Sequence, residues 1–127
     1  MSSALLGDIG QIAIVIKDLP RATAFYRDTL ALPFLFEAPG LAFFQAGSVR
    51  LMLSRAEDPE FDHPSSILYF NVEDILEAHR ILAGRGVRFR QPPHAVHNAG
   101  QRSLWIADFE DSEQNIFAMM AWRPNQS

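Results

Sequence analysis

Two histidines stand close together in the second half of the sequence and could bind a metal ion. His94 and His97 are three residues apart in the stretch QPPHAVHNAG, where prolines and a glycine predict a loop. This spacing could place both imidazoles on one face of a turn, and imidazole suits zinc, copper, iron and nickel. A catalytic metal site generally needs about three protein ligands, and no nearby carboxylate or cysteine completes the set. We therefore expect solvent-exposed loop histidines here.

Other side chains could hold an organic ligand or assist proton transfer. Arg50 and Arg102 could clamp an anion, although arginine in a half-exposed strand is more often solvated. Trp105 and Phe43 could stack on an aromatic ligand, and core packing explains them equally well. Tyr69 is the one acid–base candidate, and a phenol is a weak base at neutral pH. The sequence contains no Ser-His-Asp arrangement and no nucleotide-binding glycine fingerprint.

The composition is that of an ordinary globular chain and excludes several classes of function. Of 127 residues, 48% are hydrophobic and 20% are charged, which fits one domain over 1–127 with a buried core. The net charge is −4 and no basic run is present, which argues against nucleic acid or anionic membranes as partners. The absence of cysteine excludes disulfides and thiolate chemistry. Neither a signal peptide nor a membrane span is recognisable, so we expect a cytoplasmic protein.

A strand followed by a capped helix occurs twice in the sequence. Residues 12–16 carry isoleucine at every second position, and Asp18 is a candidate N-cap for a helix with Pro20 in its first turn. Residues 67–72 also alternate, and Asp74, 56 residues after Asp18, is the second candidate cap. Three short strands are predicted after each helix: 32–37, 41–46 and 49–54, then 87–90, 102–109 and 115–122. This order predicts two β-α-β-β-β modules, 9–56 and 66–122, joined by a linker over 57–65.

These modules resemble the vicinal oxygen chelate superfamily, which includes glyoxalase I, bleomycin resistance proteins and extradiol dioxygenases. The resemblance is carried by IAIVIKDLPRATAFYRDTL near the start and DSEQNIFAMM near the end, and it spans Ile9 to Trp122. It implies an α+β fold in which the paired modules form an incomplete barrel around a cavity. It also implies pairing of modules across a two-fold axis, so we expect a homodimer. Enzymes of the superfamily hold a divalent metal on inward-facing His, Gln or Glu side chains.

The metal positions implied by this resemblance are mostly apolar in this chain. The first falls on Gln11, a neutral oxygen donor that some members use. The second falls on Ile67, the last-strand position on Ala118, and the remaining position near Leu51, with Arg50 as the only polar neighbour. One donor among four positions is too few for a catalytic divalent ion. We therefore expect no metal and no cofactor.

Alternation along the strands predicts which side chains would line the cavity. If Gln11 faces inward, so do Ala13 and Val15, and the equivalent set in the second half is Ile67, Tyr69 and Asn71. Alternation in the last strand likewise turns Ile116, Ala118, Met120 and Trp122 inward. The alternate residues of the first strand in each half would pack under the helices: Ile12, Ile14, Ile16, Leu68, Phe70 and Val72. An apolar cavity with few polar groups is typical of a small-molecule pocket. Tyr69 is expected to be a buried phenol with a hydrogen-bonding partner.

The favoured hypothesis is a metal-independent protein that sequesters or senses an apolar or aromatic small molecule. Its predicted ligand contacts are Gln11, Arg50, Tyr69, Asn71, Arg102, Trp105, Ala118 and Met120. A second hypothesis is a metal-dependent lyase, isomerase or dioxygenase that uses Gln11 with His94 or His97. A third is a metal-free enzyme or a regulatory ligand sensor in which Tyr69 transfers a proton. The sequence leaves open whether any reaction is catalysed.

Overall fold

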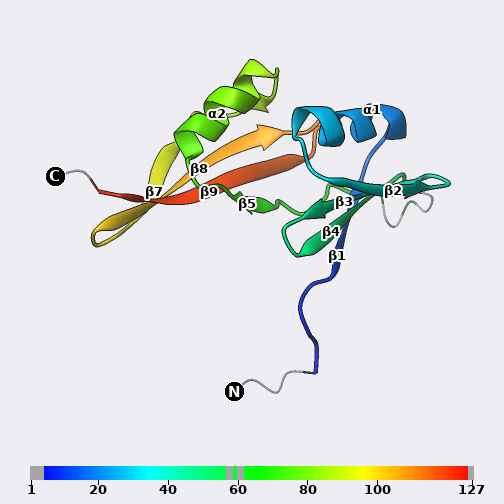
Figure 1. Cartoon of the computed structure of the whole chain (residues 1–127), viewed down its shortest axis with the longest axis horizontal. Coiled ribbons are helices and arrows are strands. Elements are labelled where there is room, and N and C mark those ends of the chain that lie inside the picture. Colours follow the sequence, from blue (N-terminus) through cyan, green and yellow to red (C-terminus); the bar gives the residue numbers. More distant parts are fainter. Residues whose placement is uncertain (1–4, 57–58, 60–61, 126–127) are drawn as a thin grey trace. The chain divides into compact units, whose positions relative to one another are not determined.

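The structure is a computed structural model that describes residues 5–56, 59 and 62–125. The chain forms two compact units, Met1–His63 and Pro64–Ser127. Their boundary lies in the segment 57–65 that the sequence predicts as a linker, of which residues 57, 58, 60 and 61 lie outside the described residues. Each unit contains its own mixed β-sheet with a helix over one face, as Figure 1 shows.

The first unit is a four-stranded sheet with one helical segment. Its elements are β1 (Gln11–Val15), α1 (Leu19–Ala24), the π-helical turn η1 (Phe25–Thr29), β2 (Phe34–Ala38), β3 (Leu41–Ala46) and β4 (Val49–Ser54). The strand order is β1-β4-β3-β2, with β1 parallel to β4 and the other neighbours antiparallel. The first and last strands of the unit are therefore side by side.

The second unit repeats this topology with one additional strand. Its elements are β5 (Tyr69–Asn71), α2 (Ile75–Gly84), β6 (Arg88–Phe89), β7 (His94–Ala99), β8 (Arg102–Glu110) and β9 (Ile116–Pro124). The strand order is β5-β9-β8-β6, with β5 parallel to β9, and β7 also pairs with β8. The predicted order of strands and helices is confirmed in both halves. The predicted loop around His94 and His97 is wrong, because this segment forms strand β7 on the edge of β8.

Both predicted helix caps are present. The Asp18 Oδ1 atom accepts a hydrogen bond from the Arg21 backbone N–H at 3.0 Å, and Asp74 Oδ1 accepts one from the Glu77 N–H at 3.1 Å. Each carboxylate satisfies a backbone donor that the first helical turn leaves without a partner. Pro20 lies at the start of α1, where a missing N–H has no consequence. Within the described residues, no helix has the length and apolar character needed to cross a membrane.

Each sheet buries one face against its own helix. In the first unit the fully buried side chains include Ile14, Leu53 and Tyr26, and the Tyr26 and Phe44 ring centroids are 5.8 Å apart. The predicted burial of Ile14 and Ile16 under the helix is confirmed. In the second unit the buried apolar residues are Ile75, Val87, Ala107, Phe109, Phe117, Ala118, Met119 and Ala121.

His79 packs at the edge of this second core. Its ring centroid lies 4.4 Å from that of Phe89, which in turn contacts Phe109 at 5.6 Å. The side chain is half-buried because α2 presents it to the short strand β6.

Candidate functional site

The candidate site in the first unit is the sheet face away from α1. The pairing of Gln11 with Arg50 and of Ala13 with Met52 places these four side chains on one face, because directly paired residues share a face. Leu51 lies on the opposite face and is 1% exposed, beneath the helix. The metal position assigned near Leu51 therefore shifts to its neighbours, an arginine and a methionine.

The Gln11 amide is held at both ends on this face. Its Oε1 atom accepts a hydrogen bond of 2.7 Å from Arg50 Nε, and its Nε2 atom lies 3.6 Å from the Met52 sulfur. The one oxygen donor among the four implied metal positions is thus turned toward a cation. A guanidinium cannot be deprotonated in proteins, so it repels a metal ion at this point. The donor set of this face does not fit a divalent metal.

Two stacked aromatic rings, Phe43 on β3 and Phe36 on the edge strand β2, lie on this face next to Arg50. The Arg50 Cζ atom lies 5.1 Å from the centroid of the Phe43 ring, a cation–π distance. The Phe36 ring stacks on Phe43 with centroids 4.4 Å apart and an interplanar angle of 23°. Phe43 is 7% exposed between these neighbours, whereas Phe36 is 45% exposed. The first unit therefore presents a cation beside an accessible aromatic ring.

Phe36 and Met52 are site candidates that the sequence reasoning missed. Met52 lies two residues from the candidate Arg50, so strand alternation in 49–54 could have indicated it. Phe36 pairs with Phe43, which pairs with Met52, and this places Phe36 on the same face. The pairing register that aligns these strands with Gln11 was needed to complete that inference.

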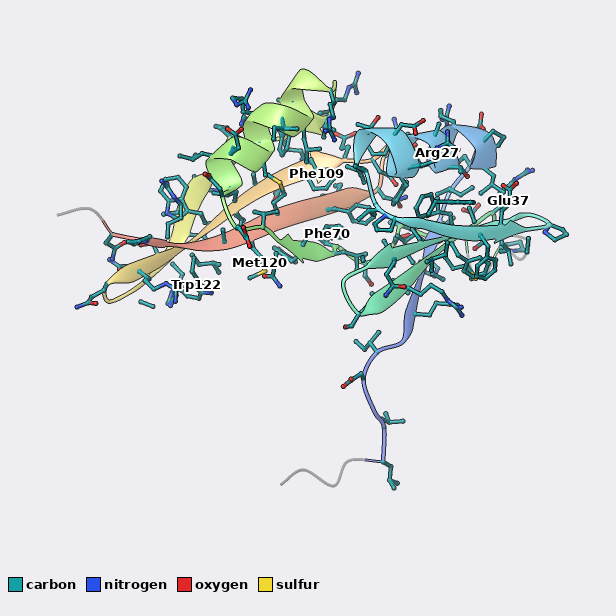
Figure 2. The ribbon with its side chains drawn as sticks, in the orientation of Figure 1. Arg27, Glu37, Phe70, Phe109, Met120 and Trp122 are labelled. Carbon is teal, nitrogen blue, oxygen red and sulfur yellow. The ribbon has the colours of Figure 1, made fainter. Side chains whose placement is uncertain are left out.

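The corresponding face of the second unit is largely apolar. Pairing of Tyr69 with Ala118 and of Asn71 with Met120 brings four predicted contact residues together. Met120 and Trp122 lie on the side of the sheet away from α2, whereas Phe109 lies between the sheet and α2 (Figure 2). Tyr69 is 53% exposed, so the expectation of a buried phenol is wrong. Its short strand at the sheet edge leaves the ring accessible.

The far end of this face carries a cluster around Trp122, which is 41% exposed. Arg102 Cζ lies 5.6 Å from the Trp122 ring, and the His97 ring centroid lies 6.3 Å from it. His97 reaches this face because a bulge between Ala95 and His97 shifts the register, so that His94 opposes Ile106 and His97 opposes Leu104. Without the bulge, residues three apart would lie on opposite faces.

These two histidines do not assemble a metal centre with other residues. His94 Nδ1 lies 2.9 Å from the Pro92 carbonyl oxygen, and the described part of the chain contains no group of three or more His, Asp or Glu side chains placed to hold a metal ion. The arrangement instead offers aromatic and imidazole surface.

Trp105 is separated from the other predicted contacts. It pairs with Ala121, which is 6% exposed, and the Arg123 Cζ atom lies 4.5 Å from its ring. Since neighbouring residues on a strand point to opposite faces, Trp105 lies on the side opposite Met120 and Trp122. Its prediction as a ligand contact therefore has no support from its position.

Comparisons with known proteins place this geometry in a family. The sequence profile of the Glyoxalase/Bleomycin resistance protein/Dioxygenase superfamily matches residues 8–119. An uncharacterized protein of Bacillus subtilis (strain 168), YraH, is 27% identical over 120 residues, which are 84% of this chain and 91% of the relative.

Solved structures of low sequence identity share the fold. A superfamily member from Sphaerobacter thermophilus DSM 20745 superposes with a TM-score of 0.77 at 20% identity, covering 92% of this chain and 98% of that one. TnmS3, an antibiotic binding protein from Streptomyces sp. CB03234, superposes with a TM-score of 0.74 at 19% identity, covering 96% and 99%. These likenesses confirm the predicted α+β fold class. Together with the profile match over most of the sequence, they show that the chain belongs to the glyoxalase/bleomycin resistance protein/dioxygenase superfamily.

Proposed function

We propose that this protein binds an organic small molecule without a metal ion, as a sequestering or sensing protein. The observation that carries the proposal is the hydrogen bond from Arg50 Nε to Gln11 Oε1, which commits the only oxygen donor at the implied metal positions to a cation. The other positions offer Ile67, Ala118 and Met52, and none of these supplies a hard oxygen or imidazole ligand. The antibiotic-binding activity named for TnmS3 supports a ligand-binding function on the same fold.

The ligand would be apolar or aromatic, because apolar side chains dominate both sheet faces. The proposed contacts are Gln11 and Arg50 for a ligand on the first unit, and Tyr69, Asn71, Arg102 and Met120 for a ligand on the second. Ala118 is 0% exposed, so its prediction as a ligand contact has no support from its position. Burial of apolar ligand surface would supply most of the affinity, at roughly 25 cal/mol per Å². The few polar groups would set the orientation of the ligand.

Metal analysis of the purified protein tests this proposal. The full chain is purified without chelators, incubated with Zn²⁺, Ni²⁺, Mn²⁺ or Fe²⁺, desalted, and analysed by mass spectrometry of the elements. We expect well below stoichiometric metal, about 0.1 equivalent or less. The variant Arg50→Glu, which replaces the cation beside Gln11 with a carboxylate, is the matched control for whether this face can be made to retain metal. Near-stoichiometric metal in the unaltered protein would refute the proposal.

A metal-dependent lyase, isomerase or dioxygenase is the alternative. The observation that favours it is the β7 bulge, which brings His94 and His97 to the same face of the second sheet. In that case His94→Ala combined with His97→Ala abolishes metal retention and activity. Unchanged retention in the double variant removes these histidines from the alternative.

We also propose a homodimer in the cytoplasm. Light scattering of the purified chain tests the oligomeric state, and a single species of the 14.3 kDa monomer mass contradicts a dimer. Fractionation of cells that express the chain tests the location.

A further inference from the structure

The Arg50 guanidinium is an oriented cation with most of its donors unused. Its Nε–H is engaged by Gln11, and Cζ lies over Phe43. A guanidinium carries five N–H donors, so four remain on its two terminal nitrogens. Within the described residues, no carboxylate lies within ion-pair distance of Arg50.

Two other arginines show what partnered guanidinium groups look like in this chain. Arg27 donates two hydrogen bonds to Asp28, and Arg80 donates two to Glu77. Those arginines lie on the helices and use the fork geometry that matches a carboxylate. Arg50 presents the same two terminal nitrogens on the sheet face away from α1, where a carboxylate of another molecule can accept their hydrogen bonds.

Gln11 and Phe43 hold Arg50 in position before any ligand arrives. A long arginine side chain normally loses rotamer freedom on binding, and prior fixation reduces that loss. Gln11 is itself fixed by the Met52 sulfur contact, so the chain of contacts from Met52 through Gln11 to Arg50 sets the direction of the fork.

The aromatic surface next to this cation defines the rest of the ligand. Phe36 is 45% exposed and stacks on Phe43, the ring over which the Arg50 guanidinium lies. Aromatic rings bind other aromatic rings by offset stacking or edge contact. One guanidinium matches a singly charged planar anion better than a phosphate, which usually recruits several donors or cations.

The repeat shows that this feature belongs to one unit only. The Ala13–Met52 pair corresponds to Tyr69–Ala118, so the positions two residues earlier, Gln11 and Arg50, correspond to Ile67 and Ile116. The second unit therefore has two isoleucines where the first has an amide and a guanidinium.

We infer that the first unit recognises the carboxylate of an aromatic acid, with the Arg50 terminal nitrogens on the carboxylate and the Phe36 ring against the aromatic group. This inference rests on the proposed ligand-binding function and names its ligand class. Gln11 is a positioning residue, because it acts on the anion through Arg50.

A pair of probes that differ only in charge tests the inference. The full chain is titrated by calorimetry with 2-naphthoate and with its neutral isostere 2-naphthamide, at pH 7.5 and low salt. We expect 2-naphthoate to bind about 10- to 100-fold more tightly, because hydrogen bonds to a charged group are worth more than those to a neutral one. Amide NMR signals of residues 11, 36 and 50 should shift on addition of the acid.

Variants assign the effect to Arg50. Arg50→Met should remove the preference for the acid, and Arg50→Lys, which keeps the charge without the fork, should retain only part of it. Gln11→Leu should weaken 2-naphthoate binding about 3- to 10-fold and reduce the preference for the acid over 2-naphthamide, a change in selectivity that a merely structural role would not give. Arg90→Met is the control, since it makes the same charge change at an exposed position. Circular dichroism before titration confirms that each variant is folded.

The outcomes separate this inference from the proposed function. Equal binding of the two probes overturns the anion assignment and leaves the ligand-binding proposal standing. Tight 2-naphthoate binding by a folded Arg50→Met variant also overturns it. Failure of both probes to bind overturns the aromatic-acid inference, and the metal analysis then decides the proposed function independently.

Discussion

The carboxylate of Asp111 organises the turn between β8 and β9, and replacing it should destabilise the second unit strongly. Asp111 is 6% exposed. Its Oδ1 atom accepts hydrogen bonds from the backbone N–H groups of Glu113 and Asn115, both at 2.8 Å, and its Oδ2 atom accepts one from Asn115 Nδ2 at 2.9 Å. This turn belongs to the DSEQN segment, which carries part of the resemblance to the superfamily.

The magnitude follows from the three donors that would lose the Asp111 carboxylate as their acceptor in Asp111→Ala. A buried donor that loses its acceptor costs about 1–3 kcal/mol, and hydrogen bonds to charged groups lie at the upper end of the usual range. Two backbone donors and one amide donor at the low end of that range give about 3 kcal/mol. Asp111→Asn keeps one oxygen for the two backbone donors but turns an NH₂ group toward Asn115, so it should cost about 1–2 kcal/mol.

Urea denaturation followed by tryptophan fluorescence measures this effect. Both tryptophans, Trp105 and Trp122, lie in β8 and β9 and therefore report on the unit that contains the turn. We expect a lower midpoint at an unchanged slope for Asp111→Ala. Ser112→Ala is the neighbouring comparison, because its hydroxyl makes one hydrogen bond, to the buried Glu113 carboxylate, and it should lower the free energy of unfolding by about 1 kcal/mol, well below the loss for Asp111→Ala. A loss below about 1 kcal/mol for Asp111→Ala would refute the reasoning.

Three further predictions follow from local geometry. Gln114 has a positive φ of 69°, a backbone conformation that glycine adopts easily and β-branched residues do not. Gln114→Gly should therefore raise the free energy of unfolding by about 0.5 kcal/mol and Gln114→Val should lower it by about 1 kcal/mol, measured by urea denaturation. Equal effects of the two substitutions would show that backbone strain is not the cause. Asp18→Ala and Asp74→Ala should each lower the free energy of unfolding by about 1 kcal/mol. Because the two caps bond different residues, the double variant should show the sum of the two losses in thermal and urea unfolding. The hydrogen bond from Arg80 lowers the pKa of the exposed Glu77 carboxyl. The stabilisation from this pair is therefore present above the unfolded-state pKa of Glu77 and is lost as the pH falls through its lower folded-state pKa. Arg80→Ala should raise that pKa in an NMR titration, and an unmoved titration curve would count against the pair.

The elements that sequence patterns predicted are those set by local interactions. The caps at Asp18 and Asp74 depend on residues only three positions apart, and the alternation of isoleucine in 12–16 depends on the strand alone. The repeat at an offset of 56 residues could be found because each copy is marked by its own local strand and cap pattern. Strand β7 was missed because Pro92 and Pro93 before it are typical of loops, and its pairing with β8 overrides that tendency.

The arrangement of the candidate site is set by the pairing of strands far apart in the sequence, which no local pattern predicts. Gln11 and Arg50 were both named as candidates, yet their hydrogen bond joins residues 39 positions apart. The assignment near Leu51 was displaced by one residue, which in a strand reverses the face to which a side chain points. The same rule explains Trp105, whose type suggested a ligand contact but whose register directs it to the opposite face from Met120.

The division of the strands between the two sheets has a consequence for assembly. Every strand pairing among the described residues joins β1–β4 to one another or β5–β9 to one another. Two copies of the chain could therefore exchange their second units without breaking any hydrogen-bonded ladder, since only the segment between β4 and β5 would change its path. The topology thus permits a domain-swapped dimer in which every strand ladder stays within its own unit.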